Sequence, residues 1–358
     1  MNPTDIALLR LDRHQVAATK CGTAQEVVAW MGAMQAQDYA MAKWAVGVRL
    51  PGATDRTIEA AVGAGRIIRT HVLRPTWHFV SADDIYWMLE LTAPHIKVGL
   101  KSRHKELGLD ETVARKSNTV IVKALRGGKH LTREELAAEL GKAKIPTDDN
   151  RASHLFMRAE LDGIVCSGTT KGGKQTYALL EERVPKTKSV TQEEALAKLA
   201  HRYFVSHGPA ALQDFVWWSG LPVRDARRAL DMVKDRLSSE TNQAQTLWFA
   251  DGVSMTGKKS VYLLPAFDEF IISYQDRSAA LPFENHTKAV SNNGIFWPVV
   301  VVNGQVMGIW KRTIKKDTVT VETKFFQPPD KTIKGLIEKA AARYGDFLDK
   351  KTEIGHTF

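Results

Sequence analysis

The sequence is poor in cysteine and has no long apolar run. Two cysteines, Cys21 and Cys166, are too few for a disulfide framework, and no Cys or His cluster has the spacing of metal ligands. The longest apolar run, at about residues 297–302, is far shorter than the roughly 20 residues that cross a bilayer. An acid stands where a signal peptide needs basic residues. We therefore expect a cytoplasmic protein without metal, cofactor or membrane contact.

Length and composition are those of an ordinary folded protein with more than one unit. The 358 residues exceed the roughly 100 to 200 residues of a typical domain. Hydrophobic residues make up 44% and charged residues 25%, which excludes a disordered or collagen-like chain. Because no low-complexity linker is present, we expect the units to pack on one another.

The charge permits nucleic-acid binding without proving it. Fifty Lys and Arg residues against 40 Asp and Glu give a net charge of +10 and a pI near 9.4. Residues 101–190 hold 18 basic and 12 acidic residues, so most of the excess lies in the middle third. A lysine-rich surface that serves solubility explains the same numbers.

The middle third has the order of a winged helix. Thr132 and Glu135 form a capping box, and a Gly172-Gly173 turn separates two short strands. Lys171 and Lys174 flank this turn at the tip of the wing. The expected helices lie at residues 110–125, 132–140 and 150–161, and the strands at 164–168 and 175–179. The helix at 150–161 would be the one that reads DNA.

The same order recurs on both sides, so the sequence predicts an α+β protein of three winged-helix units. The units are expected at residues 1–100, 101–188 and 189–358. Downstream, a capping box at Thr191 opens a helix through about residue 205; helices at 209–218 and 223–233 and strands around 251–259 follow. Upstream, the expected elements are helices near 4–17, from Thr23 and near 55–62, and a hairpin at 67–80.

The carboxyl-terminal part predicts a further hairpin. The turn Asn303-Gly304, between strands at 297–302 and 305–310, is typical of a type I′ turn. Lys311 and Arg312 follow directly. A strand near 319–325 and a helix at about 331–344 complete the prediction.

Three stretches carry candidate chemistry. Gln35 and Gln37 interrupt an apolar segment, and both can line one cavity if the helix ends there and the chain becomes extended. An amide can orient water but cannot remove its proton efficiently; surface or helix-capping glutamines are the plainer interpretation. Arg69, His71 and Arg74 alternate with strand formers and could face phosphate, or they could make ordinary hydrogen bonds. The acids and arginine of residues 263–278 fit a salt-bridged structural loop equally well.

Taken together, these motifs resemble one known family, the AlkZ-like winged-helix DNA glycosylases. The resemblance covers most of the chain and rests on Gln35-Ala36-Gln37, residues 69–78, 214–220, 264–269 with Asp276-Arg277, and 308–312. It implies three tandem winged helices in a C-shaped protein with a concave basic surface. It further implies excision of N7-alkylated purines or unhooking of interstrand crosslinks, with the Gln-x-Gln pair as catalytic residues. A sister branch carries Gln-x-Asp instead.

On this resemblance we expect Gln35 and Gln37 to orient a water against C1′ of the damaged nucleotide, in monofunctional hydrolysis without metal or cofactor. Whether the base is flipped stays open. The partner would be double-stranded DNA and the protein a monomer. The expected DNA contacts are Arg69, His71, Arg74, Lys171, Lys174, Arg277, Lys311 and Arg312. A non-catalytic DNA-binding regulator and a protein-interaction scaffold are the alternatives.

Overall fold

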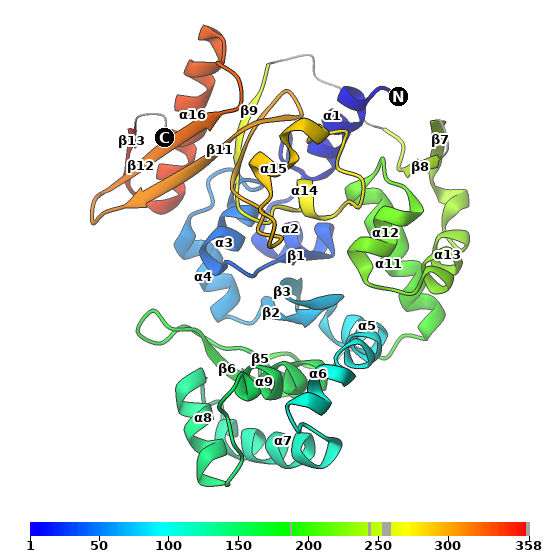
Figure 1. Ribbon diagram of the computed structural model, residues 1–358, viewed down its shortest axis with the longest axis vertical. Coiled ribbons are helices and arrows are strands. Elements are labelled where there is room, and N and C mark those ends of the chain that lie inside the picture. Colours follow the sequence, from blue (N-terminus) through cyan, green and yellow to red (C-terminus); the bar gives the residue numbers. More distant parts are fainter. Residues whose placement is uncertain (187, 243–244, 253–258, 356–358) are drawn as a thin grey trace.

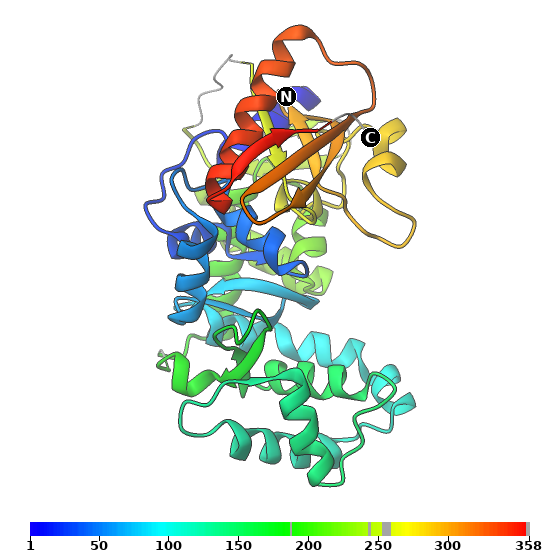
Figure 2. The ribbon, with the colours of Figure 1, turned by 90° about the vertical axis from the view of Figure 1, so that its left-hand side faces the viewer.

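The structure is a computed structural model that describes residues 1–186, 188–242, 245–252 and 259–355. Helices and sheets alternate along the chain, and all strand pairs described are antiparallel except the parallel pair β12–β13, so the class is α+β, as predicted. Figure 1 shows a lower lobe built from the middle of the chain and a larger upper lobe that contains both ends. Figure 2 shows that strands β2 and β3 lie between the two lobes.

The amino-terminal part places a small sheet against several helices. The sheet has the strand order β1-β3-β2 and is antiparallel throughout. Its strands are β1 (Ala33–Gln35), β2 (Ile67–Val72) and β3 (Arg74–Ser81). The helices are α1 (Pro3–Arg13), α2 (Ala24–Met31), α3 (Tyr39–Gly47), α4 (Asp55–Gly63), α5 (Ile85–Gly99) and α6 (Lys101–Glu106).

The middle part forms the lower lobe and has a hydrophobic core drawn from its own residues. Its three-stranded sheet has the order β4-β6-β5. Its elements are α7 (Glu111–Leu125), β4 (Leu131–Thr132), α8 (Arg133–Lys142), α9 (Arg151–Leu161), β5 (Val165–Ser167), β6 (Thr176–Leu179) and α10 (Leu180–Arg183). The capping box of Thr132 with Glu135 and the Gly172-Gly173 turn are confirmed.

The third part continues with helices and then a hairpin. These are α11 (Gln192–His207), α12 (Leu212–Ser219), α13 (Val223–Asp231), β7 (Ser238–Asn242) and β8 (Gln245–Phe249). Strand β8 ends at Phe249 before the range 251–259, where strands were expected, and residues 253–258 of that range lie outside the described residues. The turn expected at 257–259 lies mostly outside the described residues.

A five-stranded sheet of order β13-β12-β11-β10-β9 closes the chain. Its elements are β9 (Val261–Leu264), α14 (Glu269–Ile272), α15 (His286–Ala289), β10 (Val299–Val302), β11 (Gln305–Ile314), β12 (Thr318–Phe325), α16 (Lys331–Leu348) and β13 (Lys351–Ile354). Asn303 and Gly304 both have positive φ, as a type I′ turn requires, so that prediction is confirmed. Figure 1 shows the β11–β12 hairpin projecting on the same side as the β5–β6 wing.

The largest core joins the two ends of the chain. Side chains of α2, α3 and α4 pack with those of β9 to β12 and α16 in one hydrophobic cluster. The indole N–H of Trp44 donates to the carbonyl of Leu263 at 2.8 Å, and Arg49 makes a buried two-point ion pair with Asp268. The first hundred residues therefore fold against the carboxyl-terminal sheet.

Helix α9, expected to read DNA, is an interface element. It packs against β2 and α5, and none of its residues is exposed. The Arg158 guanidinium is held by Asp162 and Glu111. The expectation that its polar face is free for DNA is therefore wrong, because that face is covered by neighbouring elements.

None of the helices within the described ranges is both long and apolar enough to span a membrane.

Candidate active site

The Gln-x-Gln segment begins in an edge strand of the small sheet: Gln35 is the last residue of β1, and Gln37 lies in the bend that follows. Gln35 lies opposite His78 in the β1–β3 pairing, and the backbone N–H of Ala36 donates to the carbonyl of Trp77 at 2.7 Å. Gln35 is 7% exposed, Ala36 is fully buried and Gln37 is exposed. The predicted change from helix to extended chain is confirmed as far as Gln35, and Gln37 lies in the bend that follows.

The glutamines do not cap the helix that follows. The carboxylate of Asp38 accepts the N–H of Met41 at 3.1 Å and so caps α3. The alternative of helix-capping glutamines is therefore wrong for this chain. Neither amide is therefore used as a helix cap. Gln35 is nearly buried at the end of β1, and Gln37 is exposed.

Arg69 supports the motif from the adjacent strand. Its Nε donates to the carbonyl of Ala36 at 2.9 Å, and its guanidinium carbon lies 4.4 Å from the centre of the Trp77 ring. The side chain is buried, and this burial lowers its pKa. Arg69 thus fixes the residue between the two glutamines, and its direct contact with phosphate stays a prediction.

Glu269 supports the motif from the other side and is missing from the site residues predicted from the sequence. One carboxylate oxygen accepts the backbone N–H of Gln35 at 2.6 Å, and the other accepts the hydroxyl of Ser273. The carboxylate is fully buried, which raises its pKa. The signal in the sequence was an acid inside the apolar run of residues 263–272. The interpretation as an ion-paired loop is confirmed only for its neighbour Asp268.

Arg74 and His78 lie next to the motif with unused hydrogen-bonding groups. Among the described residues, Nε and Nη2 of Arg74 and Nε2 of His78 are buried without a hydrogen-bond partner. Burial, and then the charge of Arg74, lower the pKa of His78 well below its usual value, so its imidazole is neutral near pH 7. Glu269 supplies a negative charge near Arg74 without a hydrogen bond between them. The arginine therefore retains donors for an anionic ligand.

His71 is occupied inside the protein. Its Nδ1 contacts a carboxylate oxygen of Glu160 on α9, and the indole N–H of Trp77 donates to the other oxygen at 3.3 Å. Both His71 and Glu160 are buried. The pair joins β2 to the lower lobe, and a direct contact of His71 with DNA stays a prediction.

The wing of the lower lobe reaches α4, the second helix after the motif. The hydroxyl of Thr170 donates to Glu59 at 3.0 Å, and the hydroxyl of Tyr39 donates to the same carboxylate at 2.9 Å. The exposed Lys171 and Lys174 at the wing tip pair with Glu135 and Glu134 of α8. To bind phosphate, these lysines must give up surface ion pairs worth about 0 to 1 kcal/mol each.

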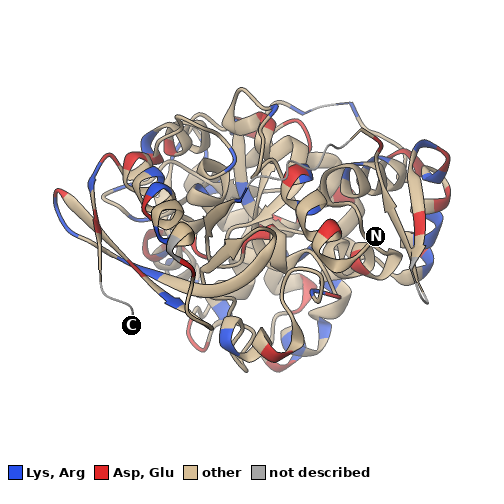
Figure 3. Ribbon diagram, turned by 90° about the horizontal axis from the view of Figure 1, so that it is seen from above, with Lys and Arg blue, Asp and Glu red and all other residues tan. Residues whose placement is uncertain are grey.

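The remaining predicted DNA contacts lie on the upper lobe. Lys311 and Arg312 stand on β11, where Lys311 pairs with Glu322 at 3.4 Å. Arg277 is half-buried and donates through Nε to the carbonyl of Ile271 at 3.0 Å. Figure 3 shows basic and acidic residues interspersed over the outer helices. Any phosphate-binding surface is thus set by local groups such as these and not by one uniformly basic face.

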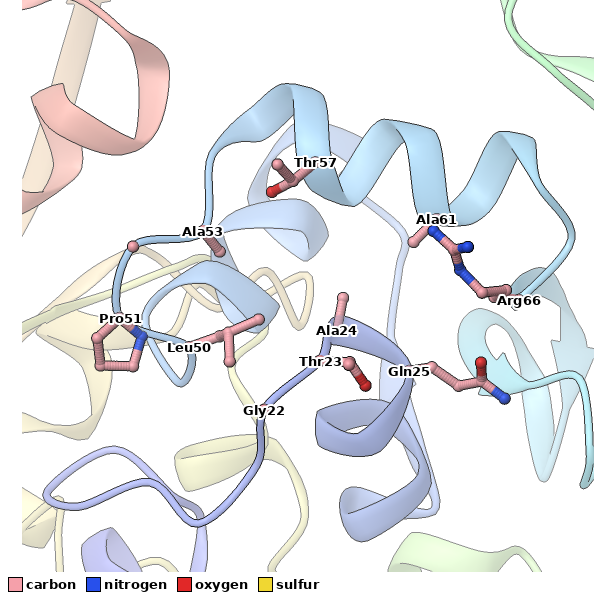
Figure 4. A pocket seen from close by; sticks show the side chains of 11 residues that line it. Gly22, Thr23, Ala24, Gln25, Leu50, Pro51, Ala53, Thr57, Ala61 and Arg66 are labelled. Carbon is pink, nitrogen blue, oxygen red and sulfur yellow. The ribbon is translucent and has the colours of Figure 1, made fainter.

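Two pockets are lined by residues of the amino-terminal helices on either side of the motif. One of about 570 Å³ is lined by Tyr39, Glu59, Thr170 and Gln175 among others, between α4 and the wing. The pocket of Figure 4, about 520 Å³, is formed by the start of α2, residues 50–53 and α4. Its labelled side chains are mostly small, with Arg66 and Gln25 at one side, and they include no acid. The first pocket includes Tyr39, which follows Gln37 by two residues, and neither pocket is lined by Gln35 or Gln37.

The described residues contain no group of three or more His, Cys, Asp or Glu side chains able to hold a metal ion. The arrangement offers two amides at the end of β1, buried neutral or ion-paired groups behind them, and partly free arginines beside them. Such a site can bind and orient water and an anion.

Comparisons with known proteins place this chain within a class. The solved structure of Streptomyces sahachiroi DNA glycosylase AlkZ matches with a TM-score of 0.82 at 19% identity, covering 99% of this chain and 100% of that one. A curated protein of the same organism, named interstrand DNA cross-link repair glycosylase, is 23% identical over 332 residues, 87% of this chain and 88% of its own length. The first comparison shows the fold.

The family comparison shows the class of enzyme. The family model described as DNA glycosylase AlkZ-like matches residues 28–347, which is most of the chain and includes the Gln-x-Gln segment. DNA glycosylases are hydrolases of N-glycosyl bonds. The chain belongs to the AlkZ-like DNA glycosylase family.

Proposed function

We propose that this DNA glycosylase hydrolyses the N-glycosidic bond of N7-alkylated purines, including those that crosslink two strands. The observation that carries the proposal is the Gln-x-Gln segment, whose Gln35 and Ala36 are held by β3, Glu269 and Arg69. The curated relative is named for crosslink repair, which supports the second substrate.

The chemistry fits two amides without a strong base. An N7-alkylated purine is cationic, so it leaves as a neutral base when the bond from C1′ to N9 breaks. Gln35 and Gln37 orient a water whose oxygen bonds to C1′, and the proton of that water passes to solvent. The product is an abasic site. Rate enhancement here comes from positioning and not from proton transfer.

Charged groups around the motif would hold the DNA backbone. Arg74 has buried donors without partners among the described residues, which suits it to a phosphate close to the glutamines. Arg277, Lys171, Lys174, Lys311 and Arg312 would contact flanking phosphates, so affinity falls as salt rises. Arg69 and His71 already have partners in the protein, and any contact they make with phosphate would be added to these.

We further propose three winged-helix units at residues 1–100, 101–188 and 189–358, arranged in a C shape around double-stranded DNA. In support, an antiparallel hairpin follows helices in each range: β2–β3, β5–β6 and β7–β8. One chain then holds three DNA-binding units, and the protein acts as a monomer.

The test is single-turnover incubation with a duplex that contains one N7-methylguanine, followed by alkali to cut abasic sites. The wild type should produce breaks, and the double variant Gln35→Ala/Gln37→Ala should produce none while it still binds the duplex. A double variant as active as the wild type would exclude the glutamines from catalysis. A crosslinked duplex is then treated in the same way, to learn whether both substrates are processed.

A further inference from the structure

Exposed apolar side chains gather beside the candidate active site. Trp217 on α12 is 42% exposed, and Ile295 and Trp297, in the loop before β10, are 41% and 44% exposed. Arg277 lies between these two segments. Its guanidinium carbon is 5.2 Å from the centre of the Trp217 ring and 5.1 Å from that of Phe296. We call Trp217, Arg277 and Phe296 the aromatic platform.

The platform is held in place by backbone contacts. The indole N–H of Trp217 donates to the carbonyl of Ile272 at 2.9 Å, and Nε of Arg277 donates to the carbonyl of Ile271 at 3.0 Å. The ring of Phe267 lies 6.1 Å from that of Phe296, and Phe267 has φ of 57°, which is costly for a bulky residue. The side chains of the platform are therefore fixed by backbone hydrogen bonds and ring contacts at the protein exterior.

The platform adjoins the glutamines through one turn of helix. Helix α14 spans four residues, about 6 Å at 1.5 Å per residue. Its first residue, Glu269, accepts the N–H of Gln35, while its last two supply the carbonyls that hold Arg277 and Trp217. Any ring stacked on the platform would therefore lie beside the nucleotide at Gln35.

A second connection runs through the turn between β2 and β3. Gly220, at the end of α12, packs so closely on this turn that a Cβ there would lie 2.3 Å from the carbonyl oxygen of Leu73. Arg74 begins β3, and the same strand pairs with Gln35 at His78. The helix that carries Trp217 is thus fixed to the strand that carries the motif.

We propose that the aromatic platform stacks one uncharged planar ring of the substrate that has left the base stack of the duplex. The proposal rests on the proposed function. Aromatic side chains with an arginine bind unstacked bases in this way because every base has a π face. The positive charge of Arg277 disfavours the cationic alkylpurine itself. The ring is therefore either a neighbouring or opposite nucleobase or an aromatic substituent on the alkylated purine.

The experiment compares the full-length protein with Trp217→Ala, Trp217→Phe and, as a matched control, Phe283→Ala. Phe283 is an exposed aromatic residue outside the platform. Two duplexes are used, one with N7-methylguanine and one with N7-benzylguanine. Binding is measured by fluorescence anisotropy. Base excision is measured in a separate assay, in which alkali cuts the strand at abasic sites. Thermal melting of every variant checks the fold.

Loss of stacking should weaken binding by Trp217→Ala about tenfold or more, while Phe283→Ala binds as the wild type does. Trp217→Phe should restore much of the affinity, because it keeps an aromatic ring, although it loses the indole N–H and part of the stacking surface. Equal loss on both duplexes identifies a nucleobase as the ring, and loss confined to the benzyl duplex identifies the substituent.

Unchanged binding by Trp217→Ala on both duplexes would overturn the platform. The platform would also be overturned if Trp217→Phe bound DNA as weakly as Trp217→Ala, because loss of the indole hydrogen bond to Ile272 would then explain the effect. A wild type that binds but cuts neither duplex contradicts the proposed function instead, and the binding arm still decides the platform.

Discussion

Removing Glu269 is expected to slow catalysis without weakening DNA binding. The carboxylate lies behind Gln35 and accepts its backbone N–H at 2.6 Å, while Ser273 donates to the other oxygen. Glu269 is fully buried and therefore cannot touch the substrate. We infer that it is a positioning residue that sets the place of Gln35.

The size of the effect follows from the hydrogen bond that the substitution removes. Glu269→Ala leaves the N–H of Gln35 unpaired in the interior, at a cost of about 1 to 3 kcal/mol in the free energy of unfolding. Loss of the negative charge near Arg74 adds to this cost. If Gln35 shifts so that about 1.4 kcal/mol of transition-state stabilisation is lost, the single-turnover rate falls about tenfold.

Two further variants separate the positioning of Gln35 from the loss of charge and from the loss of stability. Glu269→Gln is nearly isosteric, keeps an acceptor for the backbone N–H of Gln35 and removes the charge. It should retain most of the rate. Ser273→Ala removes the second hydrogen bond of Glu269 and leaves the bond to Gln35, so it reports the general loss of stability in the same place.

The assay measures the single-turnover rate at saturating duplex, the half-saturating concentration and the urea midpoint of each variant. Only Glu269→Ala should lose rate, at an unchanged half-saturating concentration. The reasoning would be refuted by Glu269→Gln falling as far as Glu269→Ala, since charge would then matter more than position. Equal losses for Ser273→Ala and Glu269→Ala would refute it as well.

Three further predictions concern pH, Arg69 and the wing. The pKa values of three buried histidines are lowered well below 6.5, so below about pH 6.5 the unfolded chain takes up protons that the folded protein excludes. As the pH is lowered, the free energy of unfolding should therefore fall by up to about 1.4 kcal/mol per pH unit for each histidine, measured by urea denaturation from pH 7.5 to 5; a flat profile would contradict this. These histidines are His14, His78 and His207. Arg69→Lys, which cannot keep both the bond to Ala36 and the stacking on Trp77, should lower the cleavage rate about tenfold and leave the salt dependence of binding unchanged; a smaller salt slope would instead identify a phosphate contact. Lys171→Ala/Lys174→Ala should reduce the slope of log K against log salt by about 2 if both lysines bind phosphate, and by nothing if their pairs with Glu135 and Glu134 persist.

Local signals in the sequence were sufficient for most elements. The capping boxes at Thr23, Thr132 and Thr191 begin helices as predicted. Each box is formed by residues three positions apart, so the local sequence is sufficient to predict it. Helix α3 was not predicted, since nearly all of it is buried and its sequence therefore lacks an apolar and a polar face. Its position depends on the carboxyl-terminal sheet, which is hundreds of residues away.

The site shows the same division between local and long-range information. The residues of the motif stand together in the sequence, so Gln35 and Gln37 could be proposed from it. Glu269 could not, because its contact with Gln35 joins positions 234 residues apart. Arg69 was predicted as a site residue that contacts phosphate. The structure instead shows its Nε donating to the carbonyl of Ala36. Sequence reasoning identified side chains able to bind phosphate, and packing decided which of them are already occupied.

The placement of α9 has a consequence for specificity. In a winged-helix regulator the corresponding helix reads base edges in the major groove. Here it is covered by β2 and α5, and His71 and Glu160 lock it there. The lower lobe would then reach DNA chiefly through its wing, whose lysines are proposed to contact phosphate, and such contacts carry no sequence information. This arrangement suits an enzyme that acts on a lesion in any sequence, whereas a regulator would lose its means of choosing a site. Binding to undamaged duplexes of different sequence should accordingly vary little, and a strong preference for one sequence would favour the regulator.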